Sequence, residues 1–174
     1  EHGRREYFDN TLGIGFGANV TIRSHKLPFL RGFPMYLTAV IQTIIFDHIP
    51  MRMQIETDGQ KWQESVIYLV LCNSPREGGG FFIAPEARID DGLLNYAMIA
   101  HCSRPMMFRI VPEVMKGTHG RFKQVRMGAC KTFQLSSDRP LYIHADGEIF
   151  SGPGTDLRKV SFEVVPNALR VVCG

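Results

Sequence analysis

The chain has 174 residues, of which 44% are hydrophobic, and it carries a formal net charge of +3. This length accommodates one domain with a substantial core, and the small positive charge gives no reason to expect a nucleic-acid-binding protein. No apolar stretch approaches the roughly 20 residues of a transmembrane helix, so we predict a soluble protein. We treat residues 1–174 as a single domain, and we expect it to be cut from a longer protein because it starts at Glu1 and is strand-like by residue 7.

Strand-like segments dominate the chain. Residues 6–22 (EYFDNTLGIGFGANVTI) begin as a strand and then become glycine-rich at Gly13, Gly15 and Gly17. Residues 51–57 and 63–72 alternate as strands do and are joined at Asp58-Gly59, which predicts a β-hairpin. Apolar and β-branched side chains predict further strands at 79–84, 93–100, 121–127, 130–136, 140–145, 148–150, 157–165 and 168–173.

Two segments have helical periodicity instead. In residues 34–48 an apolar stripe passes through Leu37, Ile41, Ile44, Ile45 and His48, and Pro50 ends the helix. The second segment, 103–117, has Ser103 and Gly117 as caps, and Pro112 predicts a kink or two short helices. Many strands with two helices favour a mainly β fold, a sandwich or a barrel.

The four cysteines are widely spaced and form no CxxC pair, which is not the pattern of a disulfide framework. They are Cys72, Cys102, Cys130 and Cys173, and three of the four sit in or beside apolar segments. We therefore interpret them as small buried side chains in a reducing compartment, the cytoplasm.

Two adjacent carboxylates, Asp90 and Asp91, stand with Gly92 directly before an apolar strand. Neighbouring side chains of an extended strand point to opposite faces, so both serve one site only if Gly92 lets the backbone turn. A carboxylate with backbone carbonyls suits Mg²⁺ or Ca²⁺, but Asp-Gly is also a common dipeptide in solvated turns. Both interpretations stay open on spacing alone.

A second Asp-Gly pair, Asp146-Gly147, separates two predicted strands and is followed by Glu148. A glutamate at the rim of a sheet can act as a general base, although most such glutamates are merely solvated. We interpret His144 as an ordinary strand side chain rather than a ligand.

Neither glycine cluster matches a nucleotide loop. Gly78-Gly79-Gly80 lacks the GxxxxGK[ST] pattern, and Gly13, Gly15 and Gly17 are misplaced for a dinucleotide fingerprint. A basic group could face anionic lipid head groups or form a solvated strand edge, and it consists of Lys116, His119, Arg121, Lys123 and Arg126.

Taken in order, these motifs resemble the C-terminal half of the bacterial diacylglycerol kinase and sphingosine kinase-like lipid kinases. The resemblance spans nearly the whole chain and is most specific where APEARIDDGLL and DGE occur together. Its pieces are residues 10–18 (NTLGIGFGA), Asn73 with Gly78–Gly80, 83–94 (IAPEARIDDGLL), 116–119 (KGTH), 146–148 (DGE) and 164–172 (VVPNALRVV).

The resemblance implies a two-layer β-sandwich that forms the C-terminal domain of a two-domain lipid kinase. It implies that Glu148 is the general base and that a structural Mg²⁺ is bound by the Asp91 carboxylate and the carbonyls of Arg88 and Leu93. Other residues would lie near the substrate or nucleotide, namely Asp146, Gly147, Asn73, Gly79 and Gly17.

In the function that the resemblance implies, the parent enzyme transfers the γ-phosphate of ATP to diacylglycerol or a related lipid alcohol. It would act in the cytoplasm, peripherally at the inner face of the membrane, and would not bind nucleic acid. The GGDGT-type loop that binds ATP in these kinases lies in an N-terminal half that is absent from this sequence, so this chain alone should be inactive or nearly so.

One departure leaves alternatives open. The family has an aspartate near the acceptor at the position of Gly17. We therefore keep three alternatives, a sphingosine or ceramide kinase, a lipid-binding module without catalysis, and a metal-stabilised interaction domain.

Overall fold

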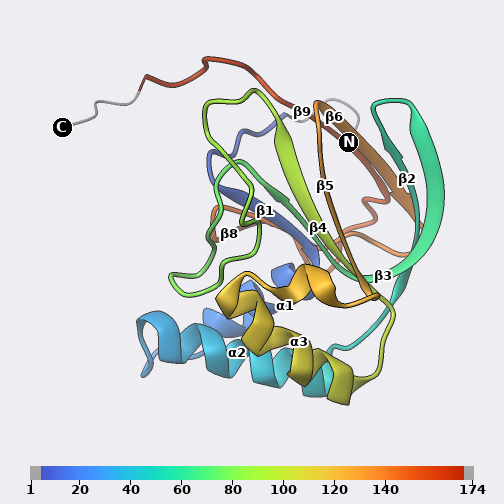
Figure 1. Ribbon diagram of the computed structural model, residues 1–174. Coiled ribbons are helices and arrows are strands. Elements are labelled where there is room, and N and C mark those ends of the chain that lie inside the picture. Colours follow the sequence, from blue (N-terminus) through green and yellow to red (C-terminus); the bar gives the residue numbers. More distant parts are fainter. Residues whose placement is uncertain (1–4, 171–174) are drawn as a thin grey trace.

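The computed structural model describes residues 5–170 (Figure 1). Along this part of the chain the elements are β1 (Thr11–Gly15), α1 (Phe16–Ser24), α2 (Gly32–Phe46), β2 (Met51–Thr57), β3 (Gln60–Cys72), β4 (Leu94–Ala100), α3 (Arg104–Lys116), the 3₁₀ helix η1 (His119–Arg121), β5 (Val125–Cys130), β6 (Thr132–Ser137), β7 (Ile143–Ala145), β8 (Glu148–Ser151) and β9 (Lys159–Glu163).

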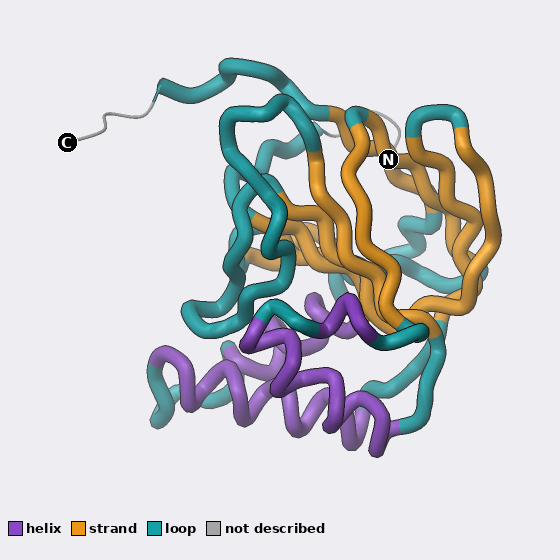
Figure 2. Tube along the Cα trace, viewed as in Figure 1, coloured by secondary structure: helices purple, strands orange, loops and turns teal. Residues whose placement is uncertain are grey.

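The strands form one antiparallel sheet that curls on itself, and the three helices cover one face near one end (Figures 1 and 2). Its main path is β8-β7-β1-β3-β2-β6-β9, and β4 and β5 extend it from the other edge of β3. The mainly β prediction is therefore confirmed, whereas the two-layer sandwich is corrected to a single curled sheet, a half-barrel, with helices on one side.

The 13-residue strand β3 organises this curl. Val66 pairs with both Met51 of β2 and Ala100 of β4, so these two strands lie on opposite edges of β3. After Val66, β1 replaces β2 as the strand that pairs with this edge of β3, and residues Tyr68–Cys72 of β3 pair with β1. A register shift between Val66 and Tyr68 bends the strand where its partner changes.

Both faces of β3 are buried, which explains its continuous apolar sequence from Val66 to Cys72. Val70 and Cys72 belong to the core between sheet and helices. Leu69 and Leu71 alternate with them and belong to the second core, inside the curl.

The predicted hairpin is confirmed. Residues 51–57 match β2, and β3 begins three residues earlier than predicted. Asp58 and Gly59 both have positive φ, 45° and 86°, as the tight turn between twisted strands requires.

The helix count was wrong, because the sequence indicated two helices and the structure has three. The missed helix, α1, follows β1 without a loop. Gly15 makes this possible, since its φ of 74° turns the strand directly into the helix. The segment contains Val20, Thr21 and Ile22, whose β-branched side chains favour strands, so packing against the sheet and α2 decides its conformation.

The helix predicted for 34–48 is confirmed as α2, but its apolar stripe is buried only in part, at Ile44 and at the half-buried Leu37. The helix covers 32–46, and its buried residues are Ala39, Val40, Thr43 and Ile44. Ile41 and Ile45 are 40% and 45% exposed, and His48 lies beyond the helix with its Nε2 2.6 Å from the carbonyl oxygen of Cys102. The helix therefore turns an apolar side outward.

The second helix is confirmed as α3. The Ser103 hydroxyl accepts a hydrogen bond from the Met106 amide, and Gly117 ends the helix in the left-handed conformation. Pro112 lies inside one continuous helix, so of the two alternatives the division into two short helices was wrong, and the kink stays a prediction.

Other strand predictions differ at their limits. Residues 79–84 form a loop with a single bridge between Glu77 and Phe81, and β5 starts only at Val125 because η1 precedes it. No strand covers 168–170, and the rest of the predicted strand 168–173 lies outside the described residues. Cys72, Cys102 and Cys130 are buried free thiols, as predicted, and Cys173 lies outside the described residues. Within residues 5–170 no helix is long and apolar enough to span a bilayer.

Candidate functional site

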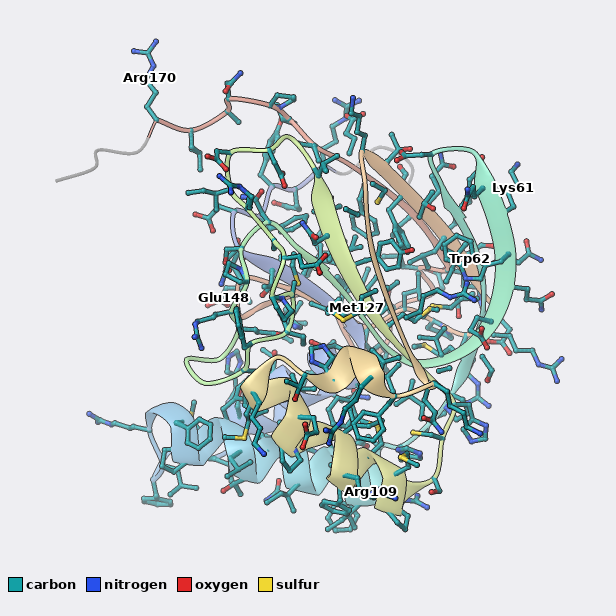
Figure 3. All side chains as sticks on the ribbon, in the orientation of Figure 1. Lys61, Trp62, Arg109, Met127, Glu148 and Arg170 are labelled. Carbon is teal, nitrogen blue, oxygen red and sulfur yellow. The ribbon has the colours of Figure 1, made fainter. Side chains whose placement is uncertain are left out.

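The β7–β8 hairpin presents Glu148 at the surface. Asp146 and Gly147 form its turn with φ values of 50° and 88°, and Glu148 follows at once as the first residue of β8, paired with Ala145. The Glu148 side chain is exposed, on the side of the molecule away from Lys61 and Trp62 (Figure 3). A carboxylate in this position is accessible to a substrate and is held by a rigid turn.

Asp146 has a structural role that its sequence position did not reveal. Its Oδ2 accepts a hydrogen bond from the Asp9 amide at 2.8 Å, and its Oδ1 accepts from the amides of Asn10 and Thr11 at 3.1 and 2.9 Å. The Asp146 amide donates back to the Thr11 carbonyl at 2.8 Å. These charge-assisted bonds clamp the turn before Glu148 onto the start of β1.

Asn73 is attached to the same segment. Its side-chain amide donates to the Asp9 carbonyl at 2.9 Å, and its backbone amide donates to the Asn10 carbonyl at 2.9 Å. The structure thus brings Asn73 and Asp146 together on either side of residues 9–11, although 73 positions separate them in the sequence.

The glycines after Asn73 make room for aromatic rings. A Cβ at Gly78 would lie 2.8 Å from the Tyr36 ring, and one at Gly80 would lie 2.6 Å from the Phe33 ring. Gly79 has open space around it and a φ of 72°. The predicted substrate contact at Gly79 stays a prediction.

In the loop before β4, the two aspartates have different partners. Asp90 pairs with the Arg88 guanidinium at 3.2 Å, and this contact lowers the pKa of Asp90. Asp91 Oδ1 accepts a hydrogen bond from the Leu93 amide at 2.9 Å, and Gly92 makes the expected turn with a φ of 69°.

This loop fits Mg²⁺ in its chemistry. Because Arg88 engages Asp90, the Asp91 carboxylate and backbone carbonyls are left as oxygen donors, and Mg²⁺ accepts few protein ligands with several waters. No group of three or more His, Cys, Asp or Glu side chains suited to a metal occurs among residues 5–170.

The predicted basic group does not form one patch. Glu113 engages Lys116 and Arg121 at 3.7 and 3.0 Å, and the Arg126 guanidinium stacks on Trp62. His119 is buried, with Nε2 3.1 Å from the Ile83 carbonyl oxygen.

An apolar cavity of about 40 Å³ lies between the sheet and the helices. Among the described residues that line it, Glu77 is the one with a charge. The lining also includes Phe16, Gly17, Val20, Tyr36, Val40, Tyr68, Phe81, Ile83, Ile99, Met107, Ile110, Val111 and Val114.

Gly17 has no space for an acidic side chain in this arrangement. A Cβ there would lie 2.6 Å from the Tyr68 ring and 3.1 Å from His144 Nε2. A Cβ at Gly13 would lie only 2.2 Å from the same nitrogen. Gly13 and Gly17 thus leave room for the His144 ring, whereas a Cβ at Gly15 would meet Met51 instead.

The sequence analysis missed the buried carboxylate of Glu77, which is 6% exposed. The Tyr68 hydroxyl donates to its Oε2 at 2.8 Å, and His144 Nε2 lies 3.0 Å from its Oε1. Burial alone would raise the pKa of Glu77, but His144, Tyr68 and Tyr36 lower it below its usual value. No sequence signal distinguished Glu77 from a solvated loop residue. His144 is a strand residue, as interpreted, and its Nε2 also lies beside the Glu77 carboxylate.

Comparison with known proteins gives a consistent result. Residues 10–173 match the model of the YegS C-terminal NAD kinase beta sandwich-like domain. The chain is 30% identical to a "Probable lipid kinase YegS-like" of Shewanella frigidimarina, in an alignment that covers 95% of this chain and 52% of the relative. It is 27% identical to a "Diacylglycerol kinase" of Mycobacterium tuberculosis, over 99% of this chain and 54% of the relative.

A solved structure shares the fold. It is described as "a putative diacylglycerol kinase from Bacillus anthracis str. Sterne". The superposition covers 91% of this chain and 51% of the solved chain, with a TM-score of 0.64 and 16% sequence identity. The chain spans about half the length of the curated relatives it matches.

Proposed function

Since the chain belongs to the family of YegS C-terminal NAD kinase beta sandwich-like domains, we propose that it is the carboxy-terminal half of a lipid kinase. The complete enzyme transfers the γ-phosphate of ATP to the hydroxyl of diacylglycerol or a related lipid alcohol. The observation that carries this proposal is Glu148, an exposed carboxylate held by the clamped β7–β8 turn.

In this reaction Glu148 accepts the proton of the lipid hydroxyl. The hydroxyl oxygen forms a bond to the γ-phosphorus, and the bond from that phosphorus to the bridging oxygen of ADP breaks. Asp146 and Gly147 do not react. They fix the position of Glu148, since the Asp146 carboxylate bonds to three backbone amides before and within β1.

In this proposal ATP binds to the part of the complete enzyme that this chain does not span, and the predicted positions of Asn73, Gly79 and Gly17 near the substrates stay predictions. Asp91 with the carbonyls of Arg88 and Leu93 would hold a structural Mg²⁺, which would fix the loop before β4.

A lipid substrate agrees with the outer surface of the helices. Phe29 before α2 and Phe46 at its end are 97% and 64% exposed, and Ile41 and Ile45 lie between them on α2. An exposed apolar surface of this kind supports peripheral contact with the inner face of the cytoplasmic membrane.

A non-catalytic lipid-binding module is the second candidate. The observation that favours it is the close packing around Gly17, which leaves no space for the family's acidic side chain.

The test is ATP-dependent phosphorylation by the complete enzyme, with diacylglycerol, sphingosine and ceramide as acceptors. We expect lipid phosphate from at least one acceptor, and the preferred acceptor distinguishes a diacylglycerol kinase from a sphingosine or ceramide kinase. A folded enzyme that phosphorylates none of them would favour the binding module.

The proposed Mg²⁺ site predicts a difference between neighbouring aspartates. Mg²⁺ should raise the Tm of the parent protein, and Asp91→Ala should abolish this increase because it removes the carboxylate ligand. Asp90→Ala is the matched control, since Asp90 pairs with Arg88, and it should keep the increase. Thermal unfolding with Mg²⁺ and with EDTA measures both, and an equal increase in Asp91→Ala would contradict the site.

A further inference from the structure

A hollow of about 420 Å³ lies beside β4 and β5, between these strands and the end of α3. Its lining includes neither Glu148 nor Asp91, so the proposed phosphoryl transfer and the proposed Mg²⁺ loop make no use of it. We propose that this hollow binds the carboxylate of a small, partly apolar organic acid. The site goes beyond the proposed function and does not depend on it.

Three segments enclose the hollow. Strands β4 and β5 form its floor, and residues 84–86 and 117–121 contribute its walls. The Met127 side chain of β5 reaches η1, since a Cβ at Gly120 would lie 3.1 Å from its Sδ (Figure 3). The volume of about 420 Å³ lies within the range of roughly 300–1,000 Å³ that is typical of small-molecule sites.

Asn95 is the buried polar side chain of this floor. It is 8% exposed, and among residues 5–170 its Nδ2 has no hydrogen-bond partner. Buried polar atoms nearly always have partners, so a buried donor beside a hollow of this size indicates a missing acceptor. The terminal torsion of an asparagine side chain is broad, so rotation of the amide can turn this donor toward the hollow.

Arg121 adds a positive charge to the lining. Its side chain is 63% exposed, and its Nη2 lies 3.0 Å from Glu113 Oε1. A guanidinium has five N–H donors, so this one contact leaves others for an anion. A carboxylate accepts hydrogen bonds both from an amide and from a guanidinium, and the bonds to the charged group are the stronger ones.

A cation is the competing ligand, because the exposed Glu86 also lines the hollow. An ammonium or amidinium group only donates hydrogen bonds, so it leaves the donor of Asn95 without a partner. The donors of Asn95 and Arg121 together therefore favour the acid.

The remaining lining suits an apolar body on the ligand. Ala84, Pro85, Met127 and Ala129 contribute apolar side chains. A cavity of about 150 Å³ is large enough for benzene, so this hollow has room for an aromatic ring together with its carboxylate.

Three planar probes of equal size test the proposal, namely benzoate, benzamide and benzamidine. Their dissociation constants from the complete enzyme are measured by NMR titration of the Met127 methyl group, which lines the hollow. We expect benzoate to bind at least about fivefold more tightly than benzamide, because it offers a charged acceptor, and benzamidine to bind most weakly. Benzamidine binding as tightly as benzoate would overturn the proposal, and so would a Met127 signal that no probe shifts.

Substitutions then assign the selectivity to its residues. Arg121→Gln should abolish the advantage of benzoate over benzamide, whereas the matched control Arg109→Gln, at an exposed position of α3 outside the hollow, should keep it (Figure 3). Asn95→Leu should weaken benzoate and benzamide and leave benzamidine unchanged. An unchanged preference for benzoate in Arg121→Gln would contradict the site, and this exposed variant decides the matter if Asn95→Leu does not fold.

The two proposals fail separately, because the titrations use neither ATP nor a lipid. An enzyme that phosphorylates no lipid but prefers benzoate would lose the kinase assignment and keep this site. A kinase without the preference for benzoate would lose this site alone.

Discussion

Glu148→Gln should lower the kcat/KM of the complete kinase by about 10²–10⁴-fold, the usual contribution of a general base. The glutamine side chain has nearly the same size and keeps hydrogen bonding with a hydroxyl, but it does not accept the proton. The unfolding temperature should not change, because the side chain is exposed and the turn is held by Asp146. Steady-state kinetics with lipid and ATP, together with thermal unfolding, measure both quantities.

The control for this variant is Glu163→Gln, which removes an exposed carboxylate of β9. In the sheet path β9 lies at the opposite end from β8, the strand that carries Glu148. It should retain full activity. If Glu148→Gln kept more than about a tenth of the wild-type kcat/KM, Glu148 would not be the base.

Gly13→Ala should destabilise the protein by about 3 kcal/mol, the upper part of the range for an overpacked core. The new methyl group would lie 2.2 Å from His144 Nε2, in a strand that is buried along its whole length and paired on both edges. Neither the ring nor the strand can move without disturbing the Glu77–His144 pair. Denaturant unfolding should therefore show a clear decrease in the midpoint.

A double-mutant cycle tests the cause. In a His144→Ala background the ring is absent, so Gly13→Ala should cost much less than in the wild type. Gly152→Ala is the matched control, because the atom nearest to its new methyl group is the flexible Ile149 Cγ2, at 3.2 Å. An equal cost of Gly13→Ala in both backgrounds would show that the ring is not responsible.

The parts of the fold that were predictable are those with local causes. The β2–β3 hairpin depends on the Asp58-Gly59 turn, and α3 depends on its caps, Ser103 and Gly117. The helix α1 was not predictable, because its β-branched residues favour a strand and the sheet beneath it decides otherwise. The curl of the sheet likewise depends on a change of partners along β3, which no local pattern records.

The candidate site divides in the same way. Motif resemblance selected Glu148 and Asp91 as functional residues, and these assignments stay predictions. The clamp made by Asp146 required the distant start of β1 to be placed beside the β7–β8 turn. The carboxylate of Glu77 looked like that of any loop residue, and only the folded structure shows that it is buried and lies beside His144.

The position of β1 between β3 and β7 has a consequence for biosynthesis. Thr11 and Asp146 are 135 positions apart, so a nascent chain leaving the ribosome exposes one edge of β1 until β7 has been made. Such distant pairing is slow to form and leaves an unpaired edge open to aggregation meanwhile. The hairpin that completes the sheet at this edge also carries Glu148. Because synthesis runs from the amino to the carboxy terminus, the proposed catalytic carboxylate is among the last parts of the domain to be placed. A nascent chain stalled before β7 does not yet contain Glu148.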